Sequence, residues 1–132
     1  METDYFKNIG QIKFEGKESN NPLAYKYYNP DQQVMGKSMR EHFKFAMAYW
    51  HSMNDNGADP FGRITNCYPW NQDPDVLQQA KNRADAAFEF LQKIGLDYFC
   101  FHDIDMLPED NSCDYSWVDK PTHLSSLLSK FK

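Results

Sequence analysis

Apolar residues at helical spacing predict one long helix near the middle of the chain, over residues 74–94. The residues on its apolar face are Leu77, Ala80, Ala84, Ala87, Phe88, Leu91 and Ile94. Positions three and four apart lie on the same side of a helix, so this stripe is expected to face a core. Asp73 suits the N-cap, Pro74 the first helical position, and Gly95 a left-handed turn that ends the helix.

A short aromatic and apolar segment at residues 98–101 follows the helix directly and predicts a buried β-strand. Polar residues end this strand, among them His102, Asp103 and Asp105. A helix, a glycine turn, a buried strand and a polar cluster, in this order, make half of a βαβ unit and predict the α/β class. In barrels and open α/β sheets the reactive groups lie where strands end, so this cluster is the first candidate site.

The apolar pattern of residues 38–53 fits two structures. Ser38 and Glu41 have the spacing of a capping box, which predicts that a helix begins there. Apolar residues then recur at helical spacing at Met39, Phe43, Met47 and Trp50. The nearly continuous apolar run of residues 45–50 fits a buried parallel strand equally well. The pattern alone leaves both structures open.

Three segments show no sustained periodicity, namely residues 1–37, 54–73 and 106–132. The first is predicted to be an extended arm that packs its aromatic residues onto another surface. The second is rich in turn residues, and loops of this length are often functional. In the third, a short amphipathic helix is predicted to begin near Thr122.

Composition narrows the functional classes. The 132 residues correspond to one domain or part of one. Nineteen acidic against fourteen basic residues give a net charge of −5, which argues against nucleic acid and anionic membranes as partners. No apolar run approaches the roughly 20 residues that span a bilayer, and the acidic N-terminus does not resemble a secretory signal. Three scattered cysteines fit a soluble protein of the reducing cytosol.

His102 and Asp105 are the main candidates for chemistry. Residues 97–114 contain six acidic residues and neither Lys nor Arg. A carboxylate beside an imidazole fixes which ring nitrogen carries the proton, which suits a group that holds or passes a proton near neutral pH. The same pair could ligate a divalent metal ion, or stabilise the strand end without any chemistry. Because both residue types and their spacing are common, the residues alone slightly favour the structural role.

Three aromatic residues form a second group of candidates. Trp50, Phe61 and Trp70 would suit the apolar C–H faces of a sugar, although aromatic residues most often fill cores. Phe61 is unusual because it lies between Pro60 and Gly62 in a polar loop. An aromatic side chain at such a loop tip is expected to insert into a pocket of its own chain or of a partner.

Motifs of one known family occur in order along the chain at residues 12–17, 21–24, 36–37, 45–46, 49–51, 57–62, 69–70, 80–90 and 98–105. Through these segments the chain resembles the longer-armed class of the xylose isomerase family over about residues 5–109. They include the sequences Gly57-Ala58-Asp59-Pro60-Phe61-Gly62 and Tyr98-Phe99-Cys100-Phe101-His102-Asp103-Ile104-Asp105. Motifs in the same order and at this density are highly specific for a family.

The resemblance implies the N-terminal portion of a (β/α)₈ TIM barrel with an extended N-terminal arm. Such a barrel needs about 250 residues, so it is incomplete in this chain. The implied domains are an arm over 1–37, the first βαβ portion over 38–109, and a divergent tail over 110–132 of the kind that a misread gene produces. The first barrel strand would cover residues 44–51, after a short helix near 38–43.

The resemblance also implies a function, the reversible conversion of D-xylose to D-xylulose and often of D-glucose to fructose. The family uses a hydride shift assisted by two divalent ions, Mg²⁺, Mn²⁺ or Co²⁺, and forms a cytoplasmic homotetramer. His102 would assist opening of the sugar ring and Asp105 would orient it. Trp50 would form an apolar wall beside the substrate, and Phe61 would reach into the site of a neighbouring subunit.

The metal ligands and the catalytic lysine of the family are expected beyond the matching residues, so the chain alone is expected to be an inactive fragment. An alternative from another class is a non-enzymatic protein that docks onto full-length isomerase subunits. It would dock through its aromatic arm and the loop that carries Phe61.

Overall fold

The computed structural model describes residues 4–106 as short strands and helices in two compact units. Among the described residues, the first unit comprises residues 4–47 together with Phe88–Cys100, and the second comprises Ala48–Ala87 together with residues 101–106. This mixture of helix and strand agrees with the α/β class, and residues 4–106 form no closed barrel. The predicted helix near Thr122 and the tail at 110–132 lie outside the described residues, and the division at residues 37 and 109 stays a prediction.

A hairpin and a single helical turn precede the main strands of the first unit. Strands β1 (Gln33–Val34) and β2 (Lys37–Ser38) pair antiparallel, and α1 covers Met39–His42. The Ser38 hydroxyl accepts a hydrogen bond from the backbone N–H of Glu41, and the Glu41 carboxylate accepts one from the backbone N–H of Ser38 at 2.7 Å. The predicted capping box is therefore confirmed.

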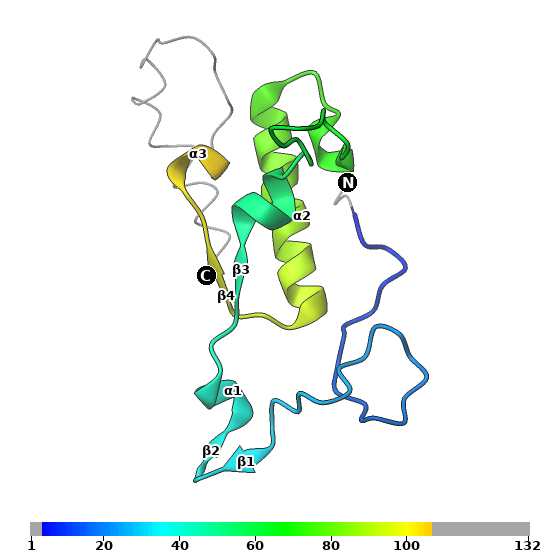
Figure 1. Ribbon diagram of the computed structural model, residues 1–132, viewed down its shortest axis with the longest axis vertical. Coiled ribbons are helices and arrows are strands. Elements are labelled where there is room, and N and C mark those ends of the chain that lie inside the picture. The colour runs from blue at the N-terminus through cyan, green and yellow to red at the C-terminus, as the bar shows by residue number, and fades with distance from the viewer. Residues whose placement is uncertain (1–3, 107–132) are drawn as a thin grey trace. The chain divides into compact units, whose positions relative to one another are not determined.

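Strands β3 (Ala46–Ala48) and β4 (Tyr98–Cys100) form a second two-stranded sheet. Figure 1 shows that both strands run in the same direction, as in a βαβ unit, with α2 (Val76–Ile94) between them in the sequence. On one face of the sheet, the ring of Phe99 contacts that of Phe88 on α2, with centroids 6.2 Å apart. The predicted order of strand, helix and strand is thus confirmed.

The first strand is shorter than the predicted range of 44–51. It ends at Ala48, and a π-helical turn covers Trp50–Asn54, so Trp50 and His51 are helical rather than extended. Of the two structures that the apolar pattern allowed, the helix is therefore the one found at residues 50–54. The helical turn carries Met53 into the core, where its side chain is 1% exposed.

The second strand is present where predicted, but its burial was overestimated. Tyr98 is 47% exposed and Phe101 is 36% exposed. The reason is that the sheet has only two strands within residues 4–106, and α2 covers one of its faces. An aromatic strand stays exposed when no further layer covers its second face.

Helix α2 confirms the longest predicted element, with a start two residues later than Pro74. The Asp75 carboxylate accepts the N–H of Leu77 at 3.0 Å, and the Asp75 carbonyl accepts the N–H of Gln79 at 2.9 Å, so Asp75 rather than Asp73 is the N-cap. Gly95 has a φ of 71°, and the N–H of Leu96 donates to the carbonyl of Leu91 at 3.0 Å. These two features define the predicted glycine C-cap.

The N-terminal arm packs against the last turns of α2 in the first unit. The Glu89 carboxylate accepts the backbone N–H groups of Tyr5 and Phe6 at 2.7 and 2.9 Å. The Tyr25 hydroxyl donates to the carbonyl of Ile94 at 2.6 Å, and the N–H of Ile12 donates to the carbonyl of Lys93, also at 2.6 Å. The last turns of α2 are therefore the surface against which the N-terminal arm packs.

Candidate active site

A buried carboxylate, Asp105, organises the end of β4 in the second unit. Helix α3 (Asp103–Met106) is a single turn that leaves Asp105 only 5% exposed. The Oδ2 atom of Asp105 accepts the backbone N–H of His102 at 2.7 Å, and its Oδ1 atom accepts the Nδ2 group of Asn54 at 3.0 Å. A buried carboxylate that is hydrogen-bonded on both oxygens is held in one position.

The imidazole of His102 is tied to the same carboxylate but stays open to solvent. Its Nδ1 atom lies 3.1 Å from Oδ2 of Asp105, while its side chain is 62% exposed. Because a carboxylate only accepts hydrogen bonds, we assign the ring proton to Nδ1. The Nε2 atom is then the ring nitrogen left to exchange a proton with a bound molecule.

Trp50 adds an apolar ring beside this imidazole. The centroids of the Trp50 and His102 rings are 4.6 Å apart, and the ring planes are tilted by 45°. The π-helical turn places Trp50 here, and the same turn carries Asn54 to Asp105. Three of the four predicted site residues, Trp50, His102 and Asp105, are therefore brought together.

Arg83 supports this cluster from α2 and was missed in the sequence. One of its guanidinium nitrogens donates to the main-chain carbonyl of Asp105 at 3.3 Å, and two others bind the side-chain oxygen of Asn71 at 3.1 and 3.3 Å. Arg83 lies 22 residues before Asp105, next to the buried Ala84 of the apolar stripe, and it binds a carbonyl of the acidic segment rather than a carboxylate. The ion pair with an acidic residue of 97–114 is made by Arg40, which binds Asp97 at 3.1 Å.

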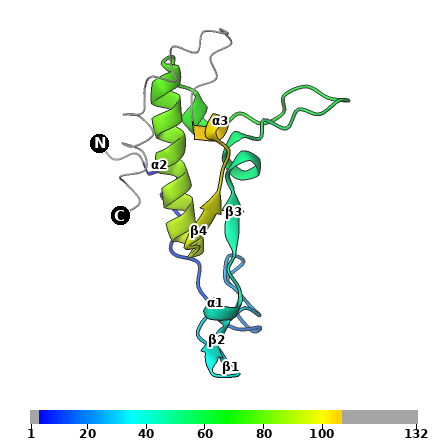
Figure 2. The same ribbon diagram turned by 90° about the vertical axis from the view of Figure 1, so that its left-hand side faces the viewer.

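The fourth predicted site residue, Phe61, is not part of this cluster. It is 98% exposed, at the tip of a loop that Figure 2 shows as a narrow excursion of the chain between the π-helical turn and α2. Local hydrogen bonds fix the loop: the Asp59 carboxylate accepts the N–H of Phe61 at 2.7 Å, and the carbonyl of Asn56 accepts the N–H groups of Thr65 and Asn66. The ring is thus presented to solvent on an ordered loop.

Trp70, the third aromatic candidate, fills the core of the second unit. It is 5% exposed, and its indole N–H donates to the carbonyl of Met53 at 3.1 Å. A short 3₁₀ turn over Pro69–Asn71 holds it there. The core role is therefore confirmed for Trp70, and a role beside a substrate is not.

Tyr49 is the most strongly perturbed group near the cluster. It is 1% exposed, and its hydroxyl has no hydrogen-bond partner within residues 4–106. Burial raises the pKa of Tyr49 far above its ordinary value, because the charged phenolate would lose its hydration. The nearby carboxylates of Asp105 and Asp85 act in the same direction, and the cation of Arg83 acts against it.

We expect Tyr49→Phe to stabilise the chain and to make it more resistant to alkali. Since the folded-state pKa of Tyr49 is raised, its stabilising contribution is complete below about pH 10 and is lost as the pH rises toward the folded value. Phenylalanine has no group that ionises, so the loss of stability at alkaline pH disappears. Removing the unpaired buried hydroxyl also raises the free energy of unfolding at pH 7, by an amount on the order of 1 kcal/mol. Urea unfolding of the full chain at pH 7 and pH 10.5 measures both effects.

The matched control for this substitution is Tyr27→Phe, since Tyr27 is 78% exposed. Its free energy of unfolding is expected to follow that of the wild-type chain at both pH values. A lower free energy of unfolding for Tyr49→Phe at pH 7 would contradict this prediction, because it would mean that the Tyr49 hydroxyl makes a hydrogen bond in the wild-type chain.

The described residues do not fit a resident metal ion. No group of three or more His, Cys, Asp or Glu side chains is arranged to hold one in this part of the chain. Both oxygens of Asp105 are already occupied by N–H donors.

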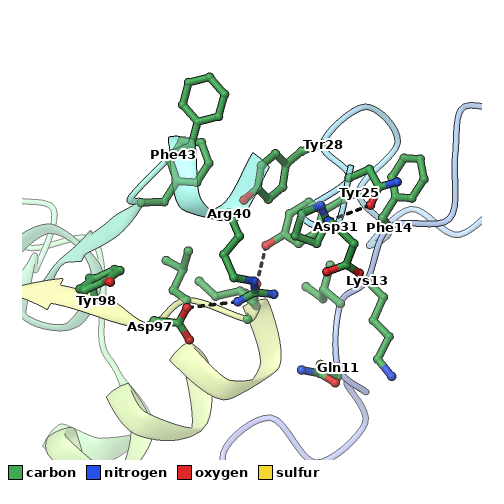
Figure 3. A pocket seen from close by; sticks show the side chains of 17 residues that line it. Gln11, Lys13, Phe14, Tyr25, Tyr28, Asp31, Arg40, Phe43, Asp97 and Tyr98 are labelled. Carbon is green, nitrogen blue, oxygen red and sulfur yellow. Dashed lines mark hydrogen bonds and ion pairs between the residues drawn. The ribbon is translucent and has the colours of Figure 1, made fainter. Parts of the chain in front are cut away.

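A cavity of about 580 Å³ lies in the first unit (Figure 3). Six of the seventeen residues that line it are aromatic, namely Phe14, Tyr25, Tyr28, Phe43, Phe45 and Tyr98. The guanidinium of Arg40 and the carboxylate of Asp97 form an ion pair of 3.1 Å at its edge. No residue predicted to be catalytic lines this cavity.

Comparison with known sequences confirms the resemblance to xylose isomerases. The chain is 51% identical over 111 residues to the xylose isomerase of Bacteroides fragilis, which covers 84% of the chain and 25% of that protein. It is 56% identical over 106 residues to xylose isomerase 1 of Xanthomonas campestris pv. campestris, covering 80% of the chain and 24% of that protein. The xylose isomerase of Pectobacterium carotovorum is 51% identical over 108 residues. No family model matches the chain.

The chain is thus a homologue of the xylose isomerases over about four fifths of its length, and it spans about a quarter of the length of these relatives. In the part of the chain that the structure describes, no helix is both long and apolar enough to cross a membrane.

Proposed function

We propose that this chain forms the N-terminal quarter of a xylose isomerase, an aldose–ketose isomerase that converts D-xylose to D-xylulose and accepts D-glucose as a second substrate. The observation that carries the proposal is the cluster of His102, Asp105 and Trp50 at the end of β4. It occurs in a chain that is 50–56% identical to xylose isomerases. The full barrel would comprise this portion and a longer remainder.

The cluster suits the opening of a sugar ring, the step that must precede isomerisation. The proposed role of Trp50 is to hold the C–H face of the sugar and to exclude water from that side. His102 exchanges a proton with the ring oxygen through Nε2, and Asp105 keeps Nδ1 protonated and the imidazole in place. Arg83 binds the main-chain carbonyl of Asp105 and Asn54 binds its carboxylate, so both residues fix the position of Asp105.

The remaining features of the proposed enzyme lie outside residues 4–106. The two divalent ions would be bound by other parts of the barrel, because this part offers no cluster of ligands for them. The proposed assembly is a cytoplasmic homotetramer in which Phe61, exposed on its ordered loop, enters the site of a neighbouring subunit.

We expect the 132-residue chain to show no xylose isomerisation by itself, with Mg²⁺ or Mn²⁺ added. A fusion of residues 1–106 to the remaining three quarters of the B. fragilis enzyme is expected to be active, because it unites the ring-opening cluster with the rest of the barrel. A coupled assay for xylulose measures both proteins, and the intact B. fragilis enzyme is the reference.

Two results would contradict this function. Turnover by the chain alone that disappears with EDTA would show that it holds a complete site. A fusion that folds as the intact enzyme does and yet lacks activity would show that the cluster does not serve this reaction.

The second candidate function is docking onto full-length isomerase subunits without catalysis. The exposed Phe61 on its hydrogen-bonded loop favours it, since a rigid aromatic side chain is a suitable anchor for a partner pocket. Binding of the chain to the intact enzyme, lost in Phe61→Ser, together with an inactive fusion would select this candidate.

A further inference from the structure

The cavity of the first unit has an aromatic wall whose rings hold one another in place (Figure 3). The rings of Tyr25 and Tyr28 meet edge to face with centroids 6.2 Å apart, and those of Tyr28 and Phe45 meet in the same way at 5.4 Å. Phe43 stacks on Phe45 at 5.8 Å. The Tyr25 hydroxyl is fixed by its hydrogen bond to the carbonyl of Ile94. The wall is therefore preformed, as the walls of small-molecule sites usually are.

The aromatic wall is also accessible to a ligand. Among its rings, Phe14 is 39% exposed, Tyr98 47%, Phe43 48% and Phe45 50%. The cavity volume of about 580 Å³ lies within the range of about 300–1,000 Å³ that is typical of small-molecule sites. Flat apolar surface of this kind suits the C–H faces of a sugar ring, as it suits other rings.

The charged side chains that line the cavity cancel one another. They are two cations and two carboxylates, from Lys13, Arg40, Asp31 and Asp97. All four are ionised near neutral pH, so the lining has no net charge. A charged ligand that leaves water for such a site finds no surplus of the opposite charge to compensate it. The charge balance therefore favours a neutral ligand.

The ion pair of Arg40 and Asp97 provides hydrogen-bonding groups at the edge of the aromatic wall (Figure 3). It joins one guanidinium nitrogen to one carboxylate oxygen at 3.1 Å, and the two side chains are 48% and 60% exposed. An exposed pair contributes little to stability. Because a guanidinium has five N–H donors and a carboxylate has two accepting oxygens, the pair retains both kinds of group for the hydroxyls of a ligand.

We propose that this cavity is a second, non-catalytic site that binds one neutral pyranose sugar. A C–H face of the sugar stacks on the aromatic wall, while its hydroxyl groups donate to Asp97 and accept from Arg40. An uncharged ring that has both apolar faces and hydroxyl groups matches the wall, the ion pair and the charge balance together. His102, Asp105 and Trp50 do not line the cavity, so the inference goes beyond the proposed function.

Titration of the ¹⁵N-labelled 132-residue chain with D-xylose tests the proposal by NMR. We expect saturable shifts of the backbone amide signals of Gly95, Leu96 and Asp97, which line the cavity. The indole N–H of Trp70, buried in the second unit, is the internal control and is expected not to shift. D-Glucuronate, which has a similar ring with a carboxylate attached, is expected to bind more weakly than D-xylose.

A matched pair of substitutions locates the sugar. Arg40→Gln removes the guanidinium and is expected to weaken D-xylose binding at least about tenfold, the effect of losing a charged hydrogen-bond donor. Arg63→Gln makes the same change at an exposed arginine that does not line the cavity, and the affinity is expected to stay that of the wild-type chain. Circular dichroism of each variant checks that the fold is unchanged.

The fusion protein shows whether the site exists in a complete barrel. Equilibrium dialysis with radiolabelled D-xylose is expected to find two bound sugars per subunit in the wild-type fusion and one in its Arg40→Gln variant. One sugar per subunit in both proteins would overturn the proposal, because the rest of the barrel would then fill the cavity.

Three results with the 132-residue chain would also overturn the proposal. They are unshifted amide signals around Gly95 at saturating D-xylose, equal affinities of Arg40→Gln and the wild-type chain, and tighter binding of D-glucuronate than of D-xylose. The last result would make the cavity an anion site. An inactive fusion that still loses one bound sugar on Arg40→Gln would contradict the proposed function and leave this site standing.

Discussion

Replacing His102 by glutamine in the fusion protein is expected to slow the isomerisation of closed-ring D-xylose by about 10²–10⁴-fold, the usual contribution of a positioned acid–base group. Glutamine keeps a polar side chain of similar length but cannot exchange a proton near neutral pH. The backbone N–H of residue 102 can still donate to Asp105, so the fold of the strand end is retained.

The substrate decides whether this loss reflects ring opening. A three-carbon aldose such as glyceraldehyde cannot close a ring and therefore does not need His102, so its rate is expected to change much less. His42→Gln is the matched control, because His42 binds the carbonyl of Val34 in the first unit and lies outside the cluster. Equal losses for both substrates would assign His102 to a step after ring opening, and unchanged rates would make it structural.

Replacing Asp105 by asparagine in the same fusion is expected to lower both activity and stability. Both carboxylate oxygens accept hydrogen bonds from N–H donors, from Asn54 on one side and from His102 on the other. An asparagine must turn its NH₂ group toward one of these donors, whichever way it is oriented. One buried donor is then left unpaired, which costs about 1–3 kcal/mol of the free energy of unfolding.

The activity of Asp105→Asn is expected to fall because the imidazole loses the acceptor that keeps its proton on Nδ1. Asp103→Asn is the matched control, since Asp103 is exposed and its side chain bonds only locally, to the N–H of Ile104. Urea unfolding and the xylulose assay are measured for both variants. If the two variants behaved alike, the buried position of Asp105 would have no special role.

Local signals in the sequence were sufficient for the elements that short-range contacts define. The capping box of Ser38 and Glu41 and the left-handed Gly95 need only residues within one turn of themselves, and both are present as predicted. The apolar stripe of α2 follows from helical geometry alone. Boundaries were less certain: α2 starts at Val76 because Asp75, rather than Asp73, makes the capping bond.

The tertiary structure decided how the segment after Ala48 folds. Its apolar residues fit a strand and a helix equally well, and no local rule separates the two. Burial of Met53 in the core of the second unit makes residues 50–54 helical. This turn also places Trp50 against His102 and brings Asn54 to Asp105.

The sequence by itself determined that His102 and Asp105 form a pair, because three residues of separation at a strand end bring them together in a single turn. The sequence also determined the family, because the chain shares motifs with xylose isomerases at many positions. Only the tertiary structure showed that Arg83 and Asn54 support Asp105 and that Phe61 stands apart on an exposed loop. Contacts between residues 22 or 51 positions apart depend on how helices and strands pack, and a pattern along the chain does not contain that packing.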